Sequence, residues 1–598
     1  MTKRLLPTAR MTALTLLMSA SPLIIGHIGA ANAAEAASPA CKGETSGIAL
    51  PHGFCATVFA DAIGHARQMV VAADGTLYVN TWSGRYYKPD QPPPDGGFIV
   101  ALKDTKNTGK ADQIVRFGES VASGGHGGTG ITLYKDGLYA EIDDKIVRYT
   151  RKSGELAPAA KAETVISGLP VTGDHPMHPI AINAKGGLFV DLGSATNACE
   201  TKNRMPGSPG LDPCKEKETR GGIWRYDASK TNQPFSPAER FASGLRNGEG
   251  LSFDSEGRIF ATQHGRDQLY EDWGKLYTPE QGHSLPAEEL VELKKGGDYG
   301  WPECYFDGDQ KKLVLVPEYG GDGGKKVGVC ADRIAPVAFF PAHYAPNDMK
   351  IYEAKQFPAA YAGGAFVALH GSWNRAPAPQ GGYSVVFQPL KDGKAAGPYT
   401  VFADGFAGKV KEPGRADHRP SGLAIAPDGS LFISDDVHGR IWHVTYSGDP
   451  KAPVEAAPAP TTVATASGEA LPPEGIHPDA GREVGNLPVP SGATKQDVAL
   501  GDQIFHGEVD GGTCGGCHGS DAKGGPIGPD LTAGKWLWSD GSLGGLTKTI
   551  ASGVPDPKDH PGAMPPMGGL DPFGQRPQGG GLLCLGRWAP NGLALSRT

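Results

Sequence analysis

Long apolar runs are scarce in this chain of 598 residues. Outside one N-terminal stretch, no apolar run is long enough to cross a bilayer, which argues against a protein with several membrane-spanning segments. Charge of one sign is not in large excess either, since charged residues make up 20% of the chain and the formal net charge is -8. No basic patch dominates, so the sequence does not indicate a nucleic-acid-binding protein.

Glycine and proline are abundant, with 87 and 51 residues. They show no Gly-X-Y period, so this density predicts many turns and a β-rich fold with short strands. The length exceeds that of one ordinary domain, and we expect two or more.

The N-terminus has the features of an export signal. Basic residues precede an apolar stretch from Met11 to Ile28, and Ala31-Asn32-Ala33 follows as a small-residue cleavage site. We therefore predict a signal peptide over residues 1–33 and a periplasmic protein, with association at the outer face of the cytoplasmic membrane left open. An uncleaved anchor is the weaker interpretation, because Pro22 and Gly26 interrupt the stretch.

The nine cysteines suit an oxidising compartment. Six of them form three local couples that bracket short loops rich in glycine and proline. We predict the disulfides Cys41–Cys55, Cys199–Cys214 and Cys304–Cys330, although sequence alone does not fix the pairing. Cys584 is left over, and the remaining two cysteines belong to a motif near the C-terminus.

A weak repeat runs through residues 41–446. Six times, a turn containing glycine leads into a short apolar strand, as tight hairpins require. The copies are Asp74–Val79, Asp136–Tyr139, Gly186–Val190, Glu256–Phe260, Gly363–Val367 and Asp428–Ile433, and some continue into a second strand, as at Lys145–Tyr149 and Arg440–Val444. Six copies predict an all-β, six-bladed β-propeller, with an array of β-sandwiches as the alternative.

The chain changes character after the propeller. Residues 447–492 are rich in proline and alanine, cannot bury a core and predict a semi-extended linker. A small domain is expected over residues 493–570. Residues 571–598 form an atypical tail without helical periodicity, and we hypothesise that the reading frame is altered after about Asp571.

The small domain carries a haem-attachment motif. Cys514, Cys517 and His518 form the sequence CGGCH, in which two thiols add to the vinyl groups of one porphyrin and the histidine reaches the iron. A helix is expected before it, over Gln496–His506, with Val498, Leu500, Ile504 and Phe505 as apolar positions. The motif predicts covalently bound haem c in an all-α domain.

The rest of this domain resembles class I cytochromes c. The segment Gly528–Leu531 matches the loop whose proline carbonyl receives the proximal imidazole N–H. The resemblance places the distal ligand at Met564, with Met567 as the alternative.

Six short segments of the propeller region resemble soluble pyrroloquinoline-quinone (PQQ) sugar dehydrogenases, and most closely the L-sorbosone dehydrogenase branch. They are Asp174-His175, Gly244–Asn247, His264–Asp267, Gly296–Pro302, His370–Arg375 and Arg419–Gly422. The resemblance implies that His175 is the general base and that Arg246 is catalytic beside it. Asp174 is expected to orient His175, and His178 and His126 are rival bases.

The resemblance also implies the cofactor ligands. PQQ contacts are assigned to Arg67, Asp174, Arg246, Asn247, Trp373, Arg375 and Arg419, and calcium to the backbone carbonyls of Gly265 and Arg266. Independently, three of these arginines, Arg246, Arg375 and Arg419, arise from different blades. Arginines that converge in this way need an anionic partner, which a tricarboxylate quinone provides.

The expected function is oxidation of an aldehyde or aldose, L-sorbosone to 2-keto-L-gulonate, by hydride transfer to PQQ. Electrons would then pass to the fused haem c and to a respiratory acceptor. Alternatives are a calcium-dependent lactonase, a non-catalytic recognition domain carrying a cytochrome, and an eight-bladed quinoprotein alcohol dehydrogenase. The six-fold count and the lack of adjacent cysteines and of a Trp-rich repeat argue against the last.

Overall fold

The computed structural model describes residues 47–458 except 82–92, 121–127, 153, 159–160, 376–377, 410 and 412–415. It also describes residue 489 and residues 494–564 except 506–513, 520–521, 523, 525–527, 555–556 and 561–563. The predicted signal peptide, most of the predicted linker, His126, Cys41, Met567, Cys584 and the atypical tail lie outside the described residues.

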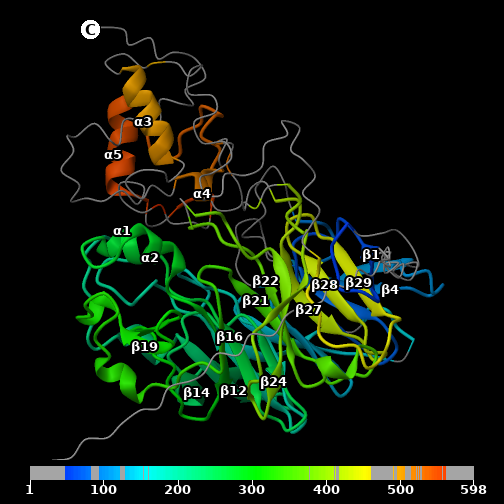
Figure 1. Ribbon diagram of the computed structural model, residues 1–598. Helices are drawn as coiled ribbons and strands as arrows, with labels where there is room; N and C mark the ends of the chain where they lie inside the picture. The colour runs from blue at the N-terminus through cyan, green and yellow to red at the C-terminus, as the bar shows by residue number, and fades with distance from the viewer. Residues whose placement is uncertain are drawn as a thin grey trace, which may run out of the picture. The chain divides into compact units, whose positions relative to one another are not determined.

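Six antiparallel sheets form a six-bladed β-propeller (Figure 1). From the inner strand outward, the blades are β2 (Ala66–Val71), β3 (Leu77–Thr81), β4 (Ile99–Lys103), β5 (Gln113–Phe117); β6 (Ile131–Tyr134), β7 (Gly137–Ile142), β8 (Lys145–Thr150), β9 (Glu163–Ser167); β10 (Ile180–Ile182), β11 (Gly187–Leu192), β12 (Gly222–Asp227), β14 (Arg240–Ser243); β15 (Leu251–Phe253), β16 (Ile259–Gln263), β17 (Glu288–Leu293), β20 (Ala338–Phe340); β21 (Pro346–Ile351), β22 (Ala365–Leu369), β23 (Ser384–Gln388), β26 (Thr400–Ala403); and β27 (Pro420–Ile425), β28 (Leu431–Asp435), β29 (Ile441–Tyr446), β1 (Phe54–Ala60). The predicted propeller is confirmed.

All six repeated turns lead into the second strand of a blade, namely β3, β7, β11, β16, β22 and β28. The last blade takes its outer strand from the start of the propeller, because β1 pairs with β29 from Phe54↔Tyr446 onward. Phe54 packs edge-on against Phe357 and Phe402, with ring centroids 4.8 and 4.9 Å away. Burial of such a ring contributes about 1.5–3 kcal/mol, so the closing strand is held by its side chains as well as its ladder.

Shorter elements decorate the blades. They are β13 (Gln233–Pro234), which pairs in parallel with β9, the hairpins β18 (Cys304–Asp307)–β19 (Lys312–Leu315) and β24 (Leu390–Lys391)–β25 (Lys394–Ala395), the helices α1 (Leu269–Trp273) and α2 (Pro279–Ser284), and 3-10 turns at Lys215–Glu218, Pro237–Glu239, Pro317–Tyr319, Gly328–Asp332 and Ala359–Tyr361. Two predicted disulfides, Cys199–Cys214 and Cys304–Cys330, are confirmed. Cys55 is also disulfide-bonded.

The C-terminal region contains three helices, α3 (Lys495–Phe505), α4 (Cys514–His518) and α5 (Leu543–Ser552). The helix predicted over Gln496–His506 is confirmed as α3. Its buried side chains include Val498, Ile504 and Phe505.

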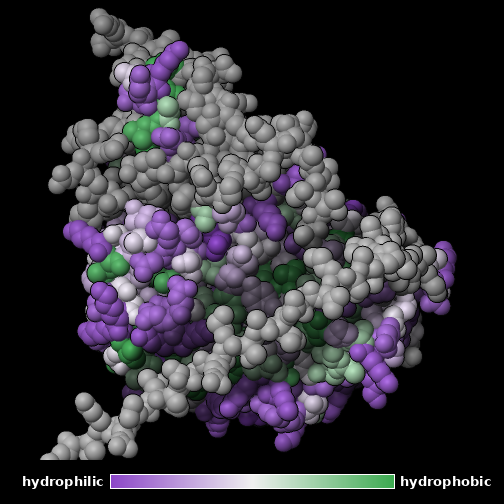
Figure 2. Space-filling model, in the orientation of Figure 1, coloured by the Kyte–Doolittle hydropathy of each residue, from purple (hydrophilic) through white to green (hydrophobic). Residues whose placement is uncertain are grey.

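The visible placed surface of the propeller is largely hydrophilic, with only small apolar areas (Figure 2). Among the helices that the structure describes, none combines the length and the apolar character needed to cross a bilayer.

Candidate functional site

The predicted site residues gather at one end of the propeller. Inner strands run antiparallel to second strands, so residues just before an inner strand and just after a second strand reach the same end of the channel. His175 precedes β10, Arg246 precedes β15 and Arg419 precedes β27. His264 follows β16 and His370 follows β22. The antiparallel topology therefore brings together residues that are far apart in the sequence.

His175 is buried and is held through one ring nitrogen. Its Nδ1 lies 2.9 Å from the carbonyl oxygen of Ser194 and 3.0 Å from the hydroxyl oxygen of Ser194. That hydroxyl donates its own hydrogen to the carbonyl of Thr196 at 2.6 Å. Both oxygens at Nδ1 therefore act as acceptors, so Nδ1 carries the hydrogen and Nε2 keeps its lone pair.

The electrostatic surroundings keep His175 neutral. Burial, then the Arg246 guanidinium, then the Arg204 guanidinium lower the pKa of His175 well below its usual value. Close packing fixes the ring as well, because a Cβ at Gly193 would stand only 2.6 Å from the His175 Cβ. The result is a neutral imidazole with a free lone pair on Nε2, the form that a general base needs.

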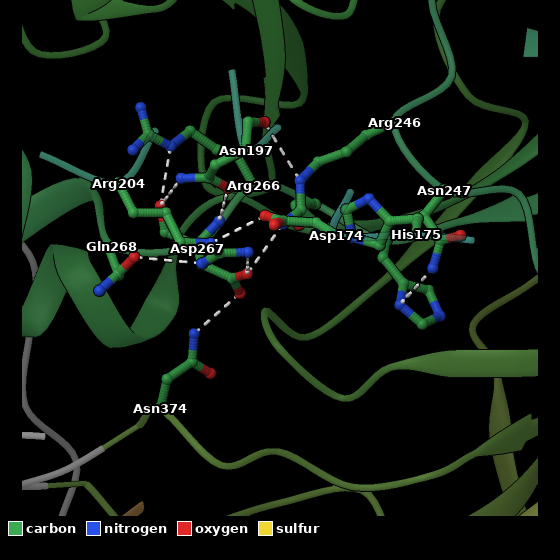
Figure 3. Close-up of polar contacts among 12 residues, drawn as sticks. Asp174, His175, Asn197, Arg204, Arg246, Asn247, Arg266, Asp267, Gln268 and Asn374 are labelled. Atoms are coloured by element: carbon green, nitrogen blue, oxygen red, sulfur yellow. Dashed lines mark hydrogen bonds and ion pairs between the residues drawn. The ribbon is translucent and has the colours of Figure 1, made fainter. Parts of the chain in front are cut away.

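Asp267 is the centre of an ion-pair cluster around Arg246 (Figure 3). One of its carboxylate oxygens accepts from Arg246 at 2.9 Å and from Arg204 at 3.0 Å. The other accepts from the Asn374 amide at 2.9 Å. The two guanidiniums hold the pKa of Asp267 far below its usual value despite burial. Asp267 therefore stays ionised and fixes the position of Arg246.

A disulfide-linked loop between β11 and β12 supports this cluster. The loop carries Asn197, whose side chain makes two 3.0 Å bonds with the backbone of Asp267. The Asn197 carbonyl accepts from Arg246 Nε at 3.2 Å. The same loop provides Arg204 and contains the Cys199–Cys214 disulfide.

Two predicted cofactor-binding arginines have no carboxylate partner in the part of the chain that the structure describes. Arg419 donates to the carbonyls of His370 and Gly371 at 3.1 and 2.7 Å. Arg375 donates to three backbone carbonyls, and its ring neighbour is Tyr344. Partly buried guanidiniums without a paired carboxylate are suited to an anionic ligand.

Arg67 differs from these two, since it forms ion pairs with Asp436 at 2.7 Å and Glu249 at 3.4 Å. Asn247 Nδ2 contacts Glu249 and His264 Nδ1, both at 3.3 Å, while its Oδ1 is buried with no hydrogen-bond partner. Trp373 is half-buried. The structure places Arg67 and Asn247 at the site but satisfies Arg67 internally.

The expected orienting role of Asp174 is wrong. Its carboxylate accepts from Arg204 at 2.9 Å and Asn203 at 3.2 Å, while Ser194 holds His175. The rival base His178 is committed elsewhere, because its nitrogens bond Glu141 at 2.9 Å and the Pro170 carbonyl at 3.0 Å. His175 is therefore the better placed base of the two.

The backbone expected to hold calcium is well supported. The Gly265 N–H donates to Glu288 at 2.8 Å, and the Gly265 carbonyl accepts from Arg246 at 2.9 Å. The Arg266 guanidinium pairs with Asp272 and Glu318, which leaves its backbone carbonyl as the group available to a cation. Burial raises the pKa of Glu288 and of the neighbouring Glu289 to about 8. Hard oxygen donors of this kind fit calcium.

Several residues at the site were not singled out from the sequence. Asp267 and Asn374 stand inside the quoted segments His264–Asp267 and His370–Arg375, so their neighbours were the available signal. Ser194 and Arg204 lie in the loop after β11, which follows no repeat, and nothing in their spacing marks them.

In the C-terminal region, Cys514 and Cys517 are free thiols one helical turn apart in α4. His518 Nδ1 donates to the Pro529 carbonyl at 2.9 Å, as predicted from the segment Gly528–Leu531. This bond leaves Nε2 for an iron atom. Met564 is half-buried and pairs through its backbone with Val554. The residues present therefore fit a covalently attached haem.

The fold and the site define a six-bladed propeller whose channel mouth joins a neutral histidine to arginines and backbone oxygens. Residues 48–447 match the model of the TrAA12-like family, and the chain belongs to that family. The chain is 28% identical over 240 residues to a pyrroloquinoline quinone-dependent pyranose dehydrogenase from Coprinopsis cinerea, covering 35% of this chain and 31% of the relative. The chain thus matches about a third of that relative's length.

Solved structures share the propeller fold. An AA12 structure from Trichoderma reesei matches with a TM-score of 0.54 and 18% identity, covering 69% of this chain and 100% of that one. The pyranose dehydrogenase PQQ domain from Coprinopsis cinerea matches with a TM-score of 0.51 and 20% identity, covering 67% and 98%. Sixty residues are 42% identical to the cbb3-type cytochrome c oxidase subunit FixP from Rhizobium etli, covering 10% of this chain and 21% of that protein.

Proposed function

We propose that this protein is a periplasmic PQQ- and calcium-dependent dehydrogenase that oxidises an aldehyde or aldose, with L-sorbosone to 2-keto-L-gulonate as the expected reaction. We further propose that the electrons pass to a haem c on Cys514 and Cys517 and then to a respiratory acceptor. The observation that carries the proposal is the neutral His175, with a free Nε2 lone pair, held beside Arg246 by Ser194. The printed name of the Coprinopsis cinerea relative supports the same chemistry.

The site residues fit the cofactor by their charge and by their unmet bonds. Arg375 and Arg419 lack carboxylate partners among the described residues and would bind the carboxylates of PQQ. Three side-chain atoms are buried without a hydrogen-bond partner here: Asn247 Oδ1, His264 Nε2 and Asn374 Oδ1. Buried polar atoms normally have partners, so these are ready to meet a polar ligand. Bound PQQ supplies a two-electron acceptor for a hydride.

The chain's own residues handle the proton and the substrate. An aldehyde reacts as its hydrate or as a cyclic hemiacetal, so a hydroxyl is present on the carbon that loses hydride. His175 Nε2 takes the proton of that hydroxyl as the C–H bond breaks. Arg246, fixed by Asp267, stabilises the negative charge that develops on the oxygen. One hydride and one proton leave the substrate, which balances a two-electron oxidation to the acid or lactone.

Dye-linked turnover tests this proposal. The purified protein is loaded with calcium, with or without PQQ, and offered L-sorbosone, aldoses and a simple lactone. PQQ-dependent dye reduction by the aldehyde or an aldose is expected. Lactone hydrolysis without PQQ, and no dye reduction by any sugar, would replace the dehydrogenase by a metal-dependent hydrolase.

A further inference from the structure

Glu289 on β17 has one carboxylate oxygen that meets nothing. Its side chain is almost wholly buried, and Oε1 accepts from the Gln263 amide at 2.9 Å. Oε2 is buried and has no hydrogen-bond partner in the part of the chain that the structure describes. An unmet carboxylate oxygen in a protein interior is costly, so this arrangement calls for a ligand.

The cavity that Glu289 lines is also the one lined by Gly265, Arg266 and Arg246. The two guanidiniums there already have their carboxylates, since Arg246 pairs with Asp267, and Arg266 with Asp272 and Glu318. Neither arginine forms an ion pair with Glu289. The cavity therefore contains a carboxylate group to which no cation of the described chain is assigned.

His264 also lines this cavity, but the chemistry of its ring makes it a donor. The Asn247 amide nitrogen lies 3.3 Å from Glu249 and 3.3 Å from His264 Nδ1, so it donates to both. Nδ1 is therefore the unprotonated nitrogen, and Nε2 carries the hydrogen. An N–H group cannot ligate a metal, which leaves Glu289 as the side-chain candidate.

Main-chain oxygens complete the set. The Gly265 peptide is fixed by the bond from its N–H to Glu288, and the carbonyls of Gly265 and Arg266 are the oxygens expected to hold calcium. Among the described residues, no group of three His, Cys, Asp or Glu side chains is arranged to hold a metal. A cation site here must therefore combine carbonyl oxygens with a single carboxylate, and neutral carbonyls alone hold calcium weakly because affinity rises with the charge of the ligands.

We propose that Glu289 supplies a carboxylate ligand to the calcium ion held by the carbonyls of Gly265 and Arg266, so that the protein binds calcium before PQQ arrives. The inference rests on the proposed function, since this is the cation of the cofactor site. It adds a residue that acts on the metal rather than on the substrate. It also sets an order of assembly, with the metal first and the quinone second.

Calcium binding to the full chain without PQQ tests the proposal. Equilibrium dialysis against Ca²⁺ compares the native protein, Glu289→Gln and Glu292→Gln. Glu292 is the matched control because it lies on the same strand but pairs with Lys294 away from the cavity. Loss of the carboxylate is expected to weaken binding by about tenfold or more, whereas Glu292→Gln leaves it unchanged.

A luminescence measurement provides a second readout at the site itself. Tb³⁺ replaces Ca²⁺ in oxygen sites, and Trp301 and Tyr305 line the same cavity and can sensitise it. Sensitised emission should appear in the native protein and in Glu292→Gln and should be lost in Glu289→Gln. Circular dichroism confirms that each variant is folded.

The outcomes separate this inference from the proposed function. Equal calcium affinity in Glu289→Gln and the native protein, or no calcium binding without PQQ, overturns the role of Glu289. Weaker calcium binding in Glu289→Gln supports it, whether or not any sugar is oxidised. PQQ-dependent turnover at saturating calcium is the separate test of the dehydrogenase.

Discussion

The backbone carbonyl of Ser194 accepts the Nδ1 hydrogen of His175 at 2.9 Å, and no carboxylate takes part in this contact. The adjacent Asp174 is instead paired with Arg204. The base is thus fixed in one tautomer by a neutral partner and stays uncharged beside two guanidiniums. This relationship determines how the site should respond to substitution and to pH.

Replacing the base should abolish turnover but preserve cofactor binding. His175→Gln removes the lone pair that takes the proton, so kcat should fall about 10²–10⁴-fold. PQQ affinity, measured by fluorescence titration, should change only a few-fold. His178→Gln is the control for a buried histidine bound to Glu141. If it lowers kcat more than His175→Gln does, the base has been assigned to the wrong residue.

The pH profile should reflect the lowered pKa of His175. A base must be deprotonated, so the acid limb of kcat/KM should lie well below pH 6.5. Arg204→Met removes one guanidinium that lowers this pKa and releases Asp174, so the acid limb should move up by about one pH unit. Arg148→Met, on an outer strand beside Glu163, should leave the limb in place. An unmoved limb in Arg204→Met would contradict the electrostatic account.

The arginines without carboxylate partners should bind the cofactor. Arg375→Met and Arg419→Met each remove a charged donor, so PQQ should bind about tenfold more weakly or worse. Arg67→Met is the comparison, since it breaks two ion pairs and should lower thermal stability as well. Unchanged PQQ affinity in both Arg375→Met and Arg419→Met would remove the anionic ligand from this end of the channel.

The architecture could be predicted further from the sequence than the site could. Asp-Gly turns before β3 and β28 are local chemistry, because positive φ angles favour glycine there, and counting them gave the number of blades. The inner strands β10 and β15 have three residues each, too few to show a period of two. Their positions emerged only from the assembled sheets.

Site prediction depended on where a residue stood in the chain. His175, Arg246 and Arg419 sit next to strands, where short matched segments mark them. Ser194 and Arg204 reach the site through the irregular loop closed by Cys199–Cys214, and such a loop has no pattern to read. Asp174 was misassigned because its neighbour in sequence is His175, whereas its partner in space is Arg204.

A buried acid should make stability depend on pH. Asp191 is fully buried with both carboxylate oxygens unpartnered, and burial, reinforced by Glu249, raises its pKa well above the usual value. Folded protein then holds a proton that unfolded protein releases above about pH 3.8, so this group costs about 1.4 kcal/mol of unfolding free energy per pH unit until the raised pKa is reached.

Asp191→Asn should therefore flatten the fall in stability between pH 5 and 8, as judged by urea unfolding. Exposed Asp309→Asn provides the control, since it should leave the slope unchanged. Parallel slopes for the native protein and Asp191→Asn would show that Asp191 is ionised in the folded state.

The coupling of sugar oxidation to the C-terminal haem is the central claim. The most direct measurement is the visible spectrum of the oxidised, calcium-loaded protein after addition of L-sorbosone, recorded with and without PQQ. The account predicts that the reduced haem c bands appear only when PQQ is present. A haem that stays oxidised with PQQ and with every aldehyde and aldose tried, while dithionite still reduces it, would contradict the account.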